Sequence, residues 1–397
     1  MISRREFLIS VSLATAPAMF LLAAACGSLP AADRTSLVPL APNPVSTTTK
    51  TIVLGFLTNF DHGDNGKPVN YSRIGQFAGQ IGRSPGIVNF FWPWKKPDGT
   101  YRPFPAELCD YIRSFGAAPL ITWPPGQADR THQVENFRGD RPQPDFDTVA
   151  LAAGTHDDYI RRWALAARAY GHPLYVRLMH EMIFAPYPWS RSQNRNDSPA
   201  KYVAAFQHIV NIFKQNRVNN VQFIWCIGVG NSKIAKDYYP GDDYVDWISL
   251  DGYNTVRNEN VPWRSFEQIF GNAYEALISF SARPMIVSEV STVEDPSDRE
   301  RKGKWFEEAI LHTIPQKMPR IKAVVLFNSK GHPAPGRTYL LATQPESFAI
   351  IKRLFQNPLC LGTMPEQPLK YDRFGTGREM TSRLPAGPVP AGKSSGD

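Results

Sequence analysis

The sequence has few cysteines, and their spacing argues against two kinds of scaffold. Only four occur in 397 residues, and no two of them form a Cys-x-x-Cys pair. With Cys26 assigned to the export signal described below, an odd number is left in the body of the chain. Neither a disulfide framework nor a zinc site is therefore indicated. We expect Cys109, Cys226 and Cys360 to be small, buried hydrophobic side chains.

Long runs of one charge are also absent. The formal charge is +8, but in the body of the chain no basic run is longer than Lys95-Lys96 or Arg161-Arg162. This pattern predicts a basic soluble surface and no nucleic-acid partner. The 35 prolines follow no collagen-like or PxxP period, and 42% of the residues are hydrophobic. The chain can therefore bury a full core, as one large domain or two ordinary ones.

The first fifty residues are typical of an export signal followed by a linker. Arg4-Arg5 precedes an apolar run, Ile9 to Ala25, that ends in small residues before Cys26. This pattern predicts a twin-arginine signal over residues 1–25 and lipidation of Cys26; the alternative is cleavage nearby at an Ala-x-Ala site. In both cases we expect the mature protein to be exported, in the periplasm or at the cell surface, with residues 26–50 as a flexible tether.

From residue 51 onward, short apolar runs alternate with amphipathic stretches. The runs are nearly continuous in Val, Ile, Leu, Phe or Trp, which is typical of parallel strands buried on both faces. There are eight of them: Thr51 to Asn59, Gly86 to Trp94, Ala118 to Pro124, Pro173 to Glu181, Asn220 to Gly228, Tyr244 to Asn254, Pro284 to Val290, and Ile321 to Asn328.

Helix-length segments lie between most of these runs. Asp157 to Tyr170 and Pro199 to Gln215 have apolar residues spaced by three and four, as an amphipathic helix requires. Gly116 and Gly171 stand where such helices end. The connection after the fifth run is short and is predicted to be loop-like.

Eight strand-helix repeats over roughly 300 residues predict an α/β fold, a (β/α)8 TIM barrel with a single catalytic domain over residues 51–356. The alternative, an open doubly wound sheet, would usually carry a Gly-rich phosphate loop after its first strand. The segment Gly55 to Gly63 is no such loop. Residues 357–397 are predicted to form a Pro-rich C-terminal extension.

Two of the predicted strands end in a glutamate. The fourth run finishes at Glu181 and the seventh reaches Glu289. Barrel enzymes carry their chemistry at the C-terminal ends of the strands. Retaining glycosidases need one protonated carboxylic acid beside the leaving oxygen and one ionised carboxylate beside the anomeric carbon. Two strand-end carboxylates in one barrel fit this requirement.

Several motifs closely resemble glycoside hydrolase family 26, the β-mannanase family. They are Asp157 to Ile160, Arg177 to Met182, Tyr187 to Trp189, Tyr238 to Asn254 and Pro284 to Glu289. The specific string is Tyr-Tyr-Pro-Gly-Asp-Asp-Tyr-Val-Asp-Trp-Ile-Ser-Leu-Asp-Gly-Tyr-Asn within the fourth of these. The resemblance covers roughly residues 51–356 and implies a retaining barrel enzyme.

The resemblance implies a role for four residues. Glu181 matches the acid/base, Glu289 the nucleophile, His180 the histidine beside the acid/base, and Tyr253 the tyrosine that hydrogen-bonds the nucleophile. The chemistry agrees, because a nearby Arg177 would favour an ionised nucleophile. An apolar rim that includes Trp189 would keep the acid protonated.

Aromatic residues near the strand ends are candidate sugar-stacking platforms. We consider Trp94, Trp123 and Trp189 for this role, with packing inside the barrel as the equally weighted alternative. Asp61 and His62, at the end of the first strand, are candidate polar contacts to the sugar; the alternative is a loop-stabilising Asx turn.

The sequence departs from the family pattern at three strand ends. Ile183 stands where a polar residue is usual, and Gly228 ends a strand that usually finishes Trp-x-Pro-Asn, with Asn231 three residues later. Leu326 stands where an aromatic residue is usual. Both carboxylates are kept, so these changes bear on the choice of sugar: mixed-linkage β-glucan, β-1,3-xylan and a bacterial exopolysaccharide stay open beside β-1,4-mannan.

The main prediction is therefore a retaining endo-β-glycosidase that acts by double displacement on a β-linked polysaccharide, with β-1,4-mannan as the best guess. The alternative is a catalytically impaired barrel that binds polysaccharide or assists exopolysaccharide assembly. A metal-dependent hydrolase would need a cluster of strand-end ligands, and His62, His180 and His332 are too dispersed to form one. We expect no cofactor or metal, and a monomer joined to the membrane through a lipid on Cys26.

Overall fold

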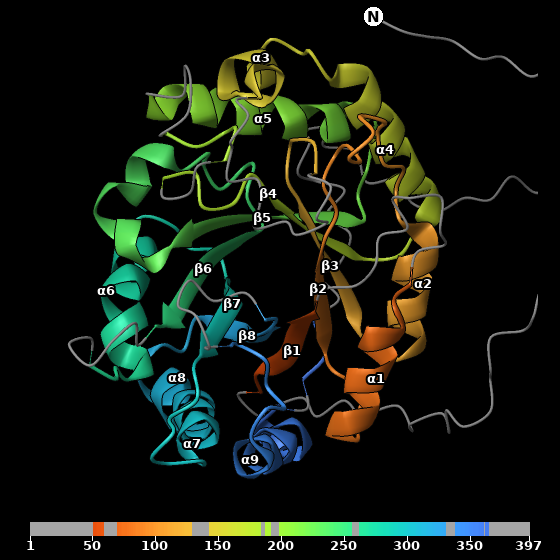
Figure 1. The fold of residues 1–397 in the computed structure, drawn as a ribbon. Helices are drawn as coiled ribbons and strands as arrows, with labels where there is room; N and C mark the ends of the chain where they lie inside the picture. The colour runs from red at the N-terminus through yellow and green to blue at the C-terminus, as the bar shows by residue number, and fades with distance from the viewer. Residues whose placement is uncertain are drawn as a thin grey trace, which may run out of the picture. The chain divides into compact units, whose positions relative to one another are not determined.

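Eight parallel strands close into a barrel in the computed structural model, which describes residues 51–58, 70–128, 143–183, 187–191, 198–255, 262–330, 338–360 and 362–364 (Figure 1). Each strand pairs with its neighbours in chain order, and the first pairs with the last. The strands are β1 (Val53–Thr58), β2 (Ile87–Phe91), β3 (Ala118–Trp123), β4 (Leu174–Leu178), β5 (Val221–Gly228), β6 (Trp247–Asn254), β7 (Met285–Thr292) and β8 (Ile321–Asn328).

The predicted (β/α)8 TIM barrel is thus confirmed. Seven of the eight predicted runs contain the observed strand, whereas β7 continues to Thr292, beyond the predicted end at Val290. The eight apolar runs are buried as predicted, because the helices cover the outside of the barrel while its interior is filled by side chains.

The helices form a ring around the strands, as Figure 1 shows. They are α1 (Ser72–Ile81), α2 (Ala106–Ser114), α3 (Thr148–Ala152), α4 (Asp157–Tyr170), α5 (Pro199–Gln215), α6 (Phe266–Ile278), α7 (Arg301–Glu308), α8 (Ile314–Lys317) and α9 (Pro345–Gln356). The two helices predicted from apolar spacing, α4 and α5, have the predicted bounds. Gly171 ends α4 in the left-handed conformation that glycine adopts without strain.

The connection after β5 contains no α-helix, in line with the prediction, but it is more regular than a loop. A 3₁₀ helix, η3 (Val229–Tyr238), starts directly after the strand. Its Ala235 and Tyr238 are buried, and α6 packs against it. This segment therefore holds its first residues close to the end of β5.

Strand residues alternate between the inside of the barrel and the helices. On β1, Val53 and Leu57 belong to the inner cluster of apolar residues, whereas Leu54 and Phe56 belong to the cluster beneath the helices. Gly55 shares the inward face, where a Cβ would lie only 2.1 Å from the side chain of Ile87. The interior is therefore too crowded at that point for any other residue.

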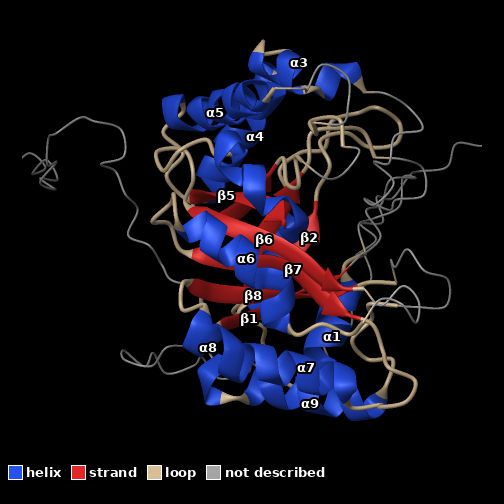
Figure 2. Cartoon of the chain, turned by 90° about the vertical axis from the view of Figure 1, so that its left-hand side faces the viewer, coloured by secondary structure: helices blue, strands red, loops and turns tan. Residues whose placement is uncertain are grey.

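The strands carry their C-terminal ends at one end of the barrel, where many of the connecting loops gather (Figure 2). Apolar residues such as Tyr175 and Ile286 fill the barrel below this end. Above them, inward positions become polar, with Asn89, Thr122 and Arg177 all buried. The barrel therefore has an apolar floor and a polar layer at the end where barrel enzymes carry their chemistry.

The three cysteines of the body, Cys109, Cys226 and Cys360, are buried and make no disulfide, as predicted. None of the helices in the described ranges has the length and apolar character needed to cross a membrane. The predicted signal, tether and C-terminal extension fall almost entirely outside the described residues. Of the extension, Leu359 accepts a hydrogen bond from the Ile52 amide at 2.7 Å and so packs next to the start of β1.

Candidate active site

Arg177, from β4, is the centre of the polar layer. Its guanidinium is fully buried and donates Nη1 to Asp251 Oδ2 at 2.5 Å and Nη2 to Glu289 Oε1. Its Nε donates to Thr122 Oγ1 at 2.9 Å, and that hydroxyl donates to Asn89 Oδ1 at 2.8 Å. A planar group with donors in fixed directions is suited to holding two carboxylates at once. The predicted contact between Arg177 and the nucleophile candidate is present.

A bulge in β7 turns Glu289 into the mouth of the barrel. Leu250 of β6 pairs with Val287, but the next residue, Asp251, pairs with Glu289, so Ser288 is skipped. Ser288 points inward and contacts the Ser249 hydroxyl at 2.6 Å. In a regular strand its neighbour would face the helices, but the bulge brings Glu289 to the same face as Asp251. Bulges commonly re-aim a side chain next to active sites.

Tyr253 and Arg177 hold the two oxygens of Glu289. The Tyr253 hydroxyl donates to Oε2 while the guanidinium of Arg177 binds Oε1. Glu289 is buried, with 7% of its surface exposed. Both oxygens of the carboxylate thus have a donor, which fixes the orientation of the group. This is the arrangement that a nucleophilic carboxylate needs.

Glu181 lies beyond the end of β4 in a strained segment of backbone. Met179 and Glu181 have φ of 44° and 52°, in the left-handed region that side chains other than glycine rarely adopt. The Glu181 amide donates to the Cys226 carbonyl at 3.0 Å, which ties the segment to β5. Residues held in this region cost about 1–3 kcal/mol each and cluster at active sites. This backbone conformation places the Glu181 side chain beside Gly228 at the barrel mouth.

Burial sets the protonation of the groups around these carboxylates. It lowers the pKa of His180 well below its ordinary value, and the charge of Arg177 lowers it further, so the imidazole is neutral. Burial also raises the pKa of Tyr253 and of Tyr187, and the nearby carboxylates add to both shifts. The two phenols therefore stay protonated, and that of Tyr253 donates a hydrogen bond to Glu289.

Asp251 and Arg177 change each other's pKa in opposite directions. Burial raises the pKa of Asp251 well above its usual range; the charge of Arg177 opposes this rise and that of Glu289 adds to it. Burial works against the charge on Arg177, yet Asp251 and Glu289 together raise its pKa well above the ordinary value. The guanidinium is therefore a permanent cation shared by two carboxyl groups.

His180, which precedes Glu181, lies within a group of aromatic rings. Its ring centroid lies 4.9 Å from that of Tyr187 and 5.7 Å from that of Phe91. Its Nδ1 is buried and has no hydrogen-bond partner among the described residues. Trp189 is fully buried, stacks on Tyr187 at 4.6 Å and donates its Nε1 to the His180 carbonyl at 2.9 Å. Trp189 thus packs against Tyr187 and His180, and its ring has no open face on which a sugar could stack.

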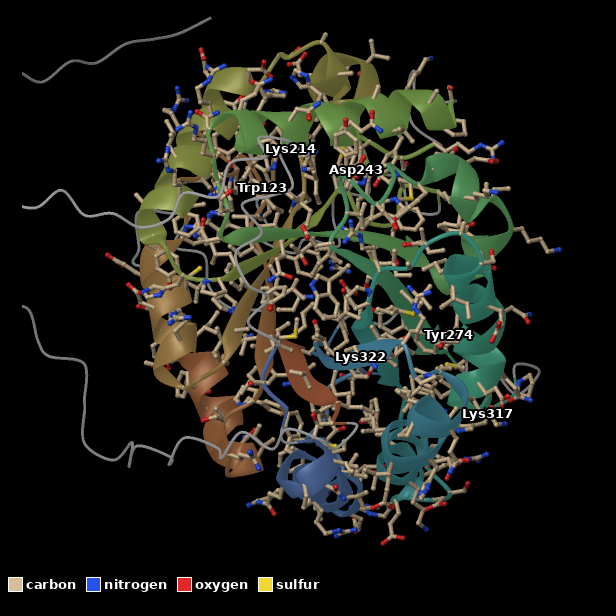
Figure 3. The ribbon with its side chains drawn as sticks, turned by 180° about the vertical axis from the view of Figure 1, so that it is seen from behind. Trp123, Lys214, Asp243, Tyr274, Lys317 and Lys322 are labelled. Carbon is tan, nitrogen blue, oxygen red and sulfur yellow. The ribbon has the colours of Figure 1, made fainter. Side chains whose placement is uncertain are left out.

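The platform interpretation is wrong for Trp94 and Trp123, and the packing alternative describes both. Neither has exposed surface. Their rings lie 4.8 Å apart, and Trp123 stacks on Trp163 at 4.4 Å. Figure 3 shows Trp123 on the inner side of the ring of helices. The physical reason is that Trp123 faces outward from its strand, toward α4, so the helix covers it.

Two predicted site residues, His62 and Cys26, and also Asp61, lie outside the described residues. Three residues of the site were missed as functional candidates: Asp251, Tyr187 and Asn89. Asp251 lies in the specific motif string, two residues before Tyr253. Alternate residues of a strand point to the same face, so this spacing could have identified Asp251 as a site residue. Within the described ranges, no three His, Cys, Asp or Glu side chains are grouped so as to hold a metal ion.

Comparison with known proteins places this arrangement in a family. Residues 156–290, which include both Glu181 and Glu289, match glycosyl hydrolase family 26. Endoglucanase H of Acetivibrio thermocellus is 32% identical over 284 residues, which are 70% of this chain and 28% of that protein. The chain thus spans less than a third of the length of this curated relative.

Solved structures with the same barrel include two from this family. The catalytic domain of the Bacillus sp. JAMB-750 GH26 endo-β-1,4-mannanase superposes with a TM-score of 0.54 at 17% identity, over 77% of this chain and 86% of that one. The GH26 β-mannanase BoMan26A of Bacteroides ovatus gives a TM-score of 0.52 at 14% identity, over 78% and 90%. At these identities the likeness concerns the fold.

Proposed function

Because this chain belongs to glycosyl hydrolase family 26, we propose that it is a retaining endo-β-glycosidase that hydrolyses a β-linked polysaccharide. The observation that carries the proposal is the double hold on Glu289, whose two oxygens accept hydrogen bonds from Arg177 and Tyr253. A buried carboxylate fixed in this way, with a second glutamate at the mouth of the same barrel, has the parts that double displacement needs.

In the proposed reaction Glu289 attacks the anomeric carbon while Glu181 donates a proton to the glycosidic oxygen. The bond to the leaving sugar breaks, and the remaining sugar is held as an ester of Glu289. Glu181, now ionised, takes a proton from a water molecule that attacks the same carbon and frees Glu289. Two displacements at one carbon retain its configuration. Tyr253 and Arg177 stabilise Glu289 each time it carries the full negative charge.

For the polysaccharide we place β-glucan first and β-1,4-mannan second. The name of the 32% identical relative, Endoglucanase H, supports a glucan. The family resemblance of the motifs supports a mannan. Since the chain spans 28% of that relative, the name alone does not fix the substrate of the shared part. Both polymers therefore belong in the test.

We also propose that the protein is exported and anchored by a lipid on Cys26, and that it acts as a monomer. The support is the paired arginine, the apolar run and the small residues before Cys26. Labelled fatty acid that enters the full chain and is lost in Cys26→Ser would support the anchor. Unlabelled full chain would contradict it.

The function is tested by incubating the protein with barley β-glucan, glucomannan, galactomannan and β-1,3-xylan and measuring new reducing ends. We expect one polymer to be cleaved with retention, and Glu289→Ala to lose about 10⁴-fold or more in kcat. Glu275→Ala, which removes an exposed carboxylate on α6, is the matched control and should keep full activity.

Small nucleophiles then separate the two carboxylates. With an activated aryl glycoside and azide, Glu289→Ala should give the glycosyl azide of inverted configuration, because azide replaces the nucleophile. Glu181→Ala should give the retained azide, because azide then attacks the ester of Glu289. Folded protein that cleaves none of the polymers would contradict the hydrolase, and a glycan array would then test the polysaccharide-binding alternative.

A further inference from the structure

The end of β5 carries no side chain beside the proposed acid. Gly228 has no side chain, and a Cβ placed on it would lie 3.5 Å from Glu181 Oε1 and 3.9 Å from Asn231 Nδ2. The carboxyl of one residue and the carboxamide of the other therefore face the same point above the strand. The backbone of Gly228, with φ of −73° and ψ of 140°, is one that any residue can adopt. Its conformation alone therefore does not require glycine.

Asn231 is the second polar group beside Gly228. It lies in the first turn of η3, is half-buried, and makes no side-chain hydrogen bond within the part of the chain that the structure describes. A carboxamide offers two donors and an accepting oxygen. Buried Ala235 and Tyr238 anchor η3 against its neighbours, so Asn231 is held on a rigid segment. A fixed carboxamide next to a catalytic acid is suited to a ligand hydroxyl.

We propose that Asn231 binds a hydroxyl group of the leaving sugar, and that Gly228 keeps the point shared by Asn231 and Glu181 free of a side chain. This inference rests on the proposed function, because it takes Glu181 as the acid. The acid must touch the glycosidic oxygen, so the sugar that this oxygen carries away passes directly beside the Glu181 carboxyl. The bare backbone of Gly228 lies beside that carboxyl, and the Asn231 carboxamide lies beside the same point. Asn231 is thus a substrate-binding residue for the leaving-group side.

The test compares a substrate that has a leaving sugar with one that lacks it. The first is the polymer that the wild-type protein cleaves, and the second is the 4-nitrophenyl glycoside of the disaccharide with the same sugar and linkage. Asn231→Ala should lower kcat/KM on the polymer by about tenfold more than on the aryl glycoside, the effect of one lost hydrogen bond. Gly228→Ala should act in the same direction, because its methyl group would occupy the point that Glu181 and Asn231 share. Lys233→Ala, exposed on the same helix, is the matched control.

Each outcome bears on the proposal. Equal losses on both substrates in Asn231→Ala would overturn it, because Asn231 would then act on the retained sugar, on Glu181 or on the fold. A loss in Lys233→Ala as large as that in Asn231→Ala would also overturn it. If the wild-type protein cleaves neither substrate, the proposed function fails and this inference fails with it. Wild-type cleavage with no selective loss overturns the inference alone.

Discussion

The two sides of the strands at the barrel mouth carry different side chains. On the inward side, Arg177, Asp251 and Glu289 form a buried network of charges. On the outward side, near the ends of β2 and β3, a stack of buried aromatic rings includes Trp94 and Trp123. The difference follows from the direction in which each side chain points. Thr122 and Trp123 are neighbours in β3, yet Thr122 faces inward to Arg177 while Trp123 faces the helices. Position at a strand end therefore predicts function only for the inward face.

Replacing Arg177 should have the largest effect, because it changes both stability and catalysis. Arg177→Met leaves the carboxyl groups of Asp251 and Glu289 buried together without their cation. We expect a loss of about 3–5 kcal/mol in the free energy of unfolding, and a fall in kcat of about 10²-fold or more, because Glu289 loses one of its two donors. Urea unfolding and steady-state kinetics measure the two effects.

The control for this change is an exposed ion pair. Arg161→Met removes a contact to Asp158 at 3.0 Å, and Asp158 is largely exposed. Such surface pairs contribute less than about 1 kcal/mol. Similar losses in Arg161→Met and Arg177→Met would mean that the buried network has no special role.

Replacing Trp123 should affect stability and leave catalysis intact. Trp123→Ala opens a cavity beside Trp163 and removes the donor to the Tyr159 hydroxyl, 3.2 Å away. We expect the free energy of unfolding to fall by about 3–5 kcal/mol, with KM for the polysaccharide unchanged at a temperature where the variant is folded. A raised KM with unchanged stability would instead make Trp123 part of the sugar-binding surface and would remove the contrast between the two sides.

The sequence predicts most of the barrel, because apolar runs and helical spacing report directly on burial. It also predicts Glu181 and Glu289 at the barrel mouth, since both stand at the ends of strands, whereas the contact of Tyr253 with Glu289 was implied by the family resemblance. The outward direction of Trp123 was missed, although Thr122 beside it is the better candidate for the inward face. Which residues of a strand face inward has to be established before the aromatic residues at its end are interpreted as sugar-binding.

Two features of the site have no local signal. The bulge at Ser288 depends on how β7 pairs with β6, and no residue type in the run demands it. The left-handed backbone at Met179 and Glu181 contradicts their local preference and exists only because the surrounding structure holds it. Neither could be deduced from composition or period.

Another buried cation sharpens the comparison, because it has a carboxylate partner outside the site and serves another purpose. Lys302, on α7, is fully buried and donates to Glu294 at 3.1 Å and to the Leu340 carbonyl at 2.6 Å. It joins the segment after β7 to the segment before α9. Burial lowers its pKa from 10.5 to about 8, although Glu294 opposes the shift. The two carboxylates around Arg177 outweigh burial, whereas the single one beside Lys302 does not.

Lys302 should therefore make stability depend on pH in the alkaline range. Below pH 8 the amine is protonated in both the folded and the unfolded chain and adds no dependence. Between about 8 and 10.5 the unfolded chain keeps a proton that the folded chain has released, so the free energy of unfolding rises with pH. The full rise is about 3 kcal/mol. Comparison with Lys302→Met cancels other titrations: the wild-type advantage should grow by that amount from pH 7.5 to 10.5. A constant difference would show that Lys302 titrates normally and that its burial has no energetic consequence for the fold.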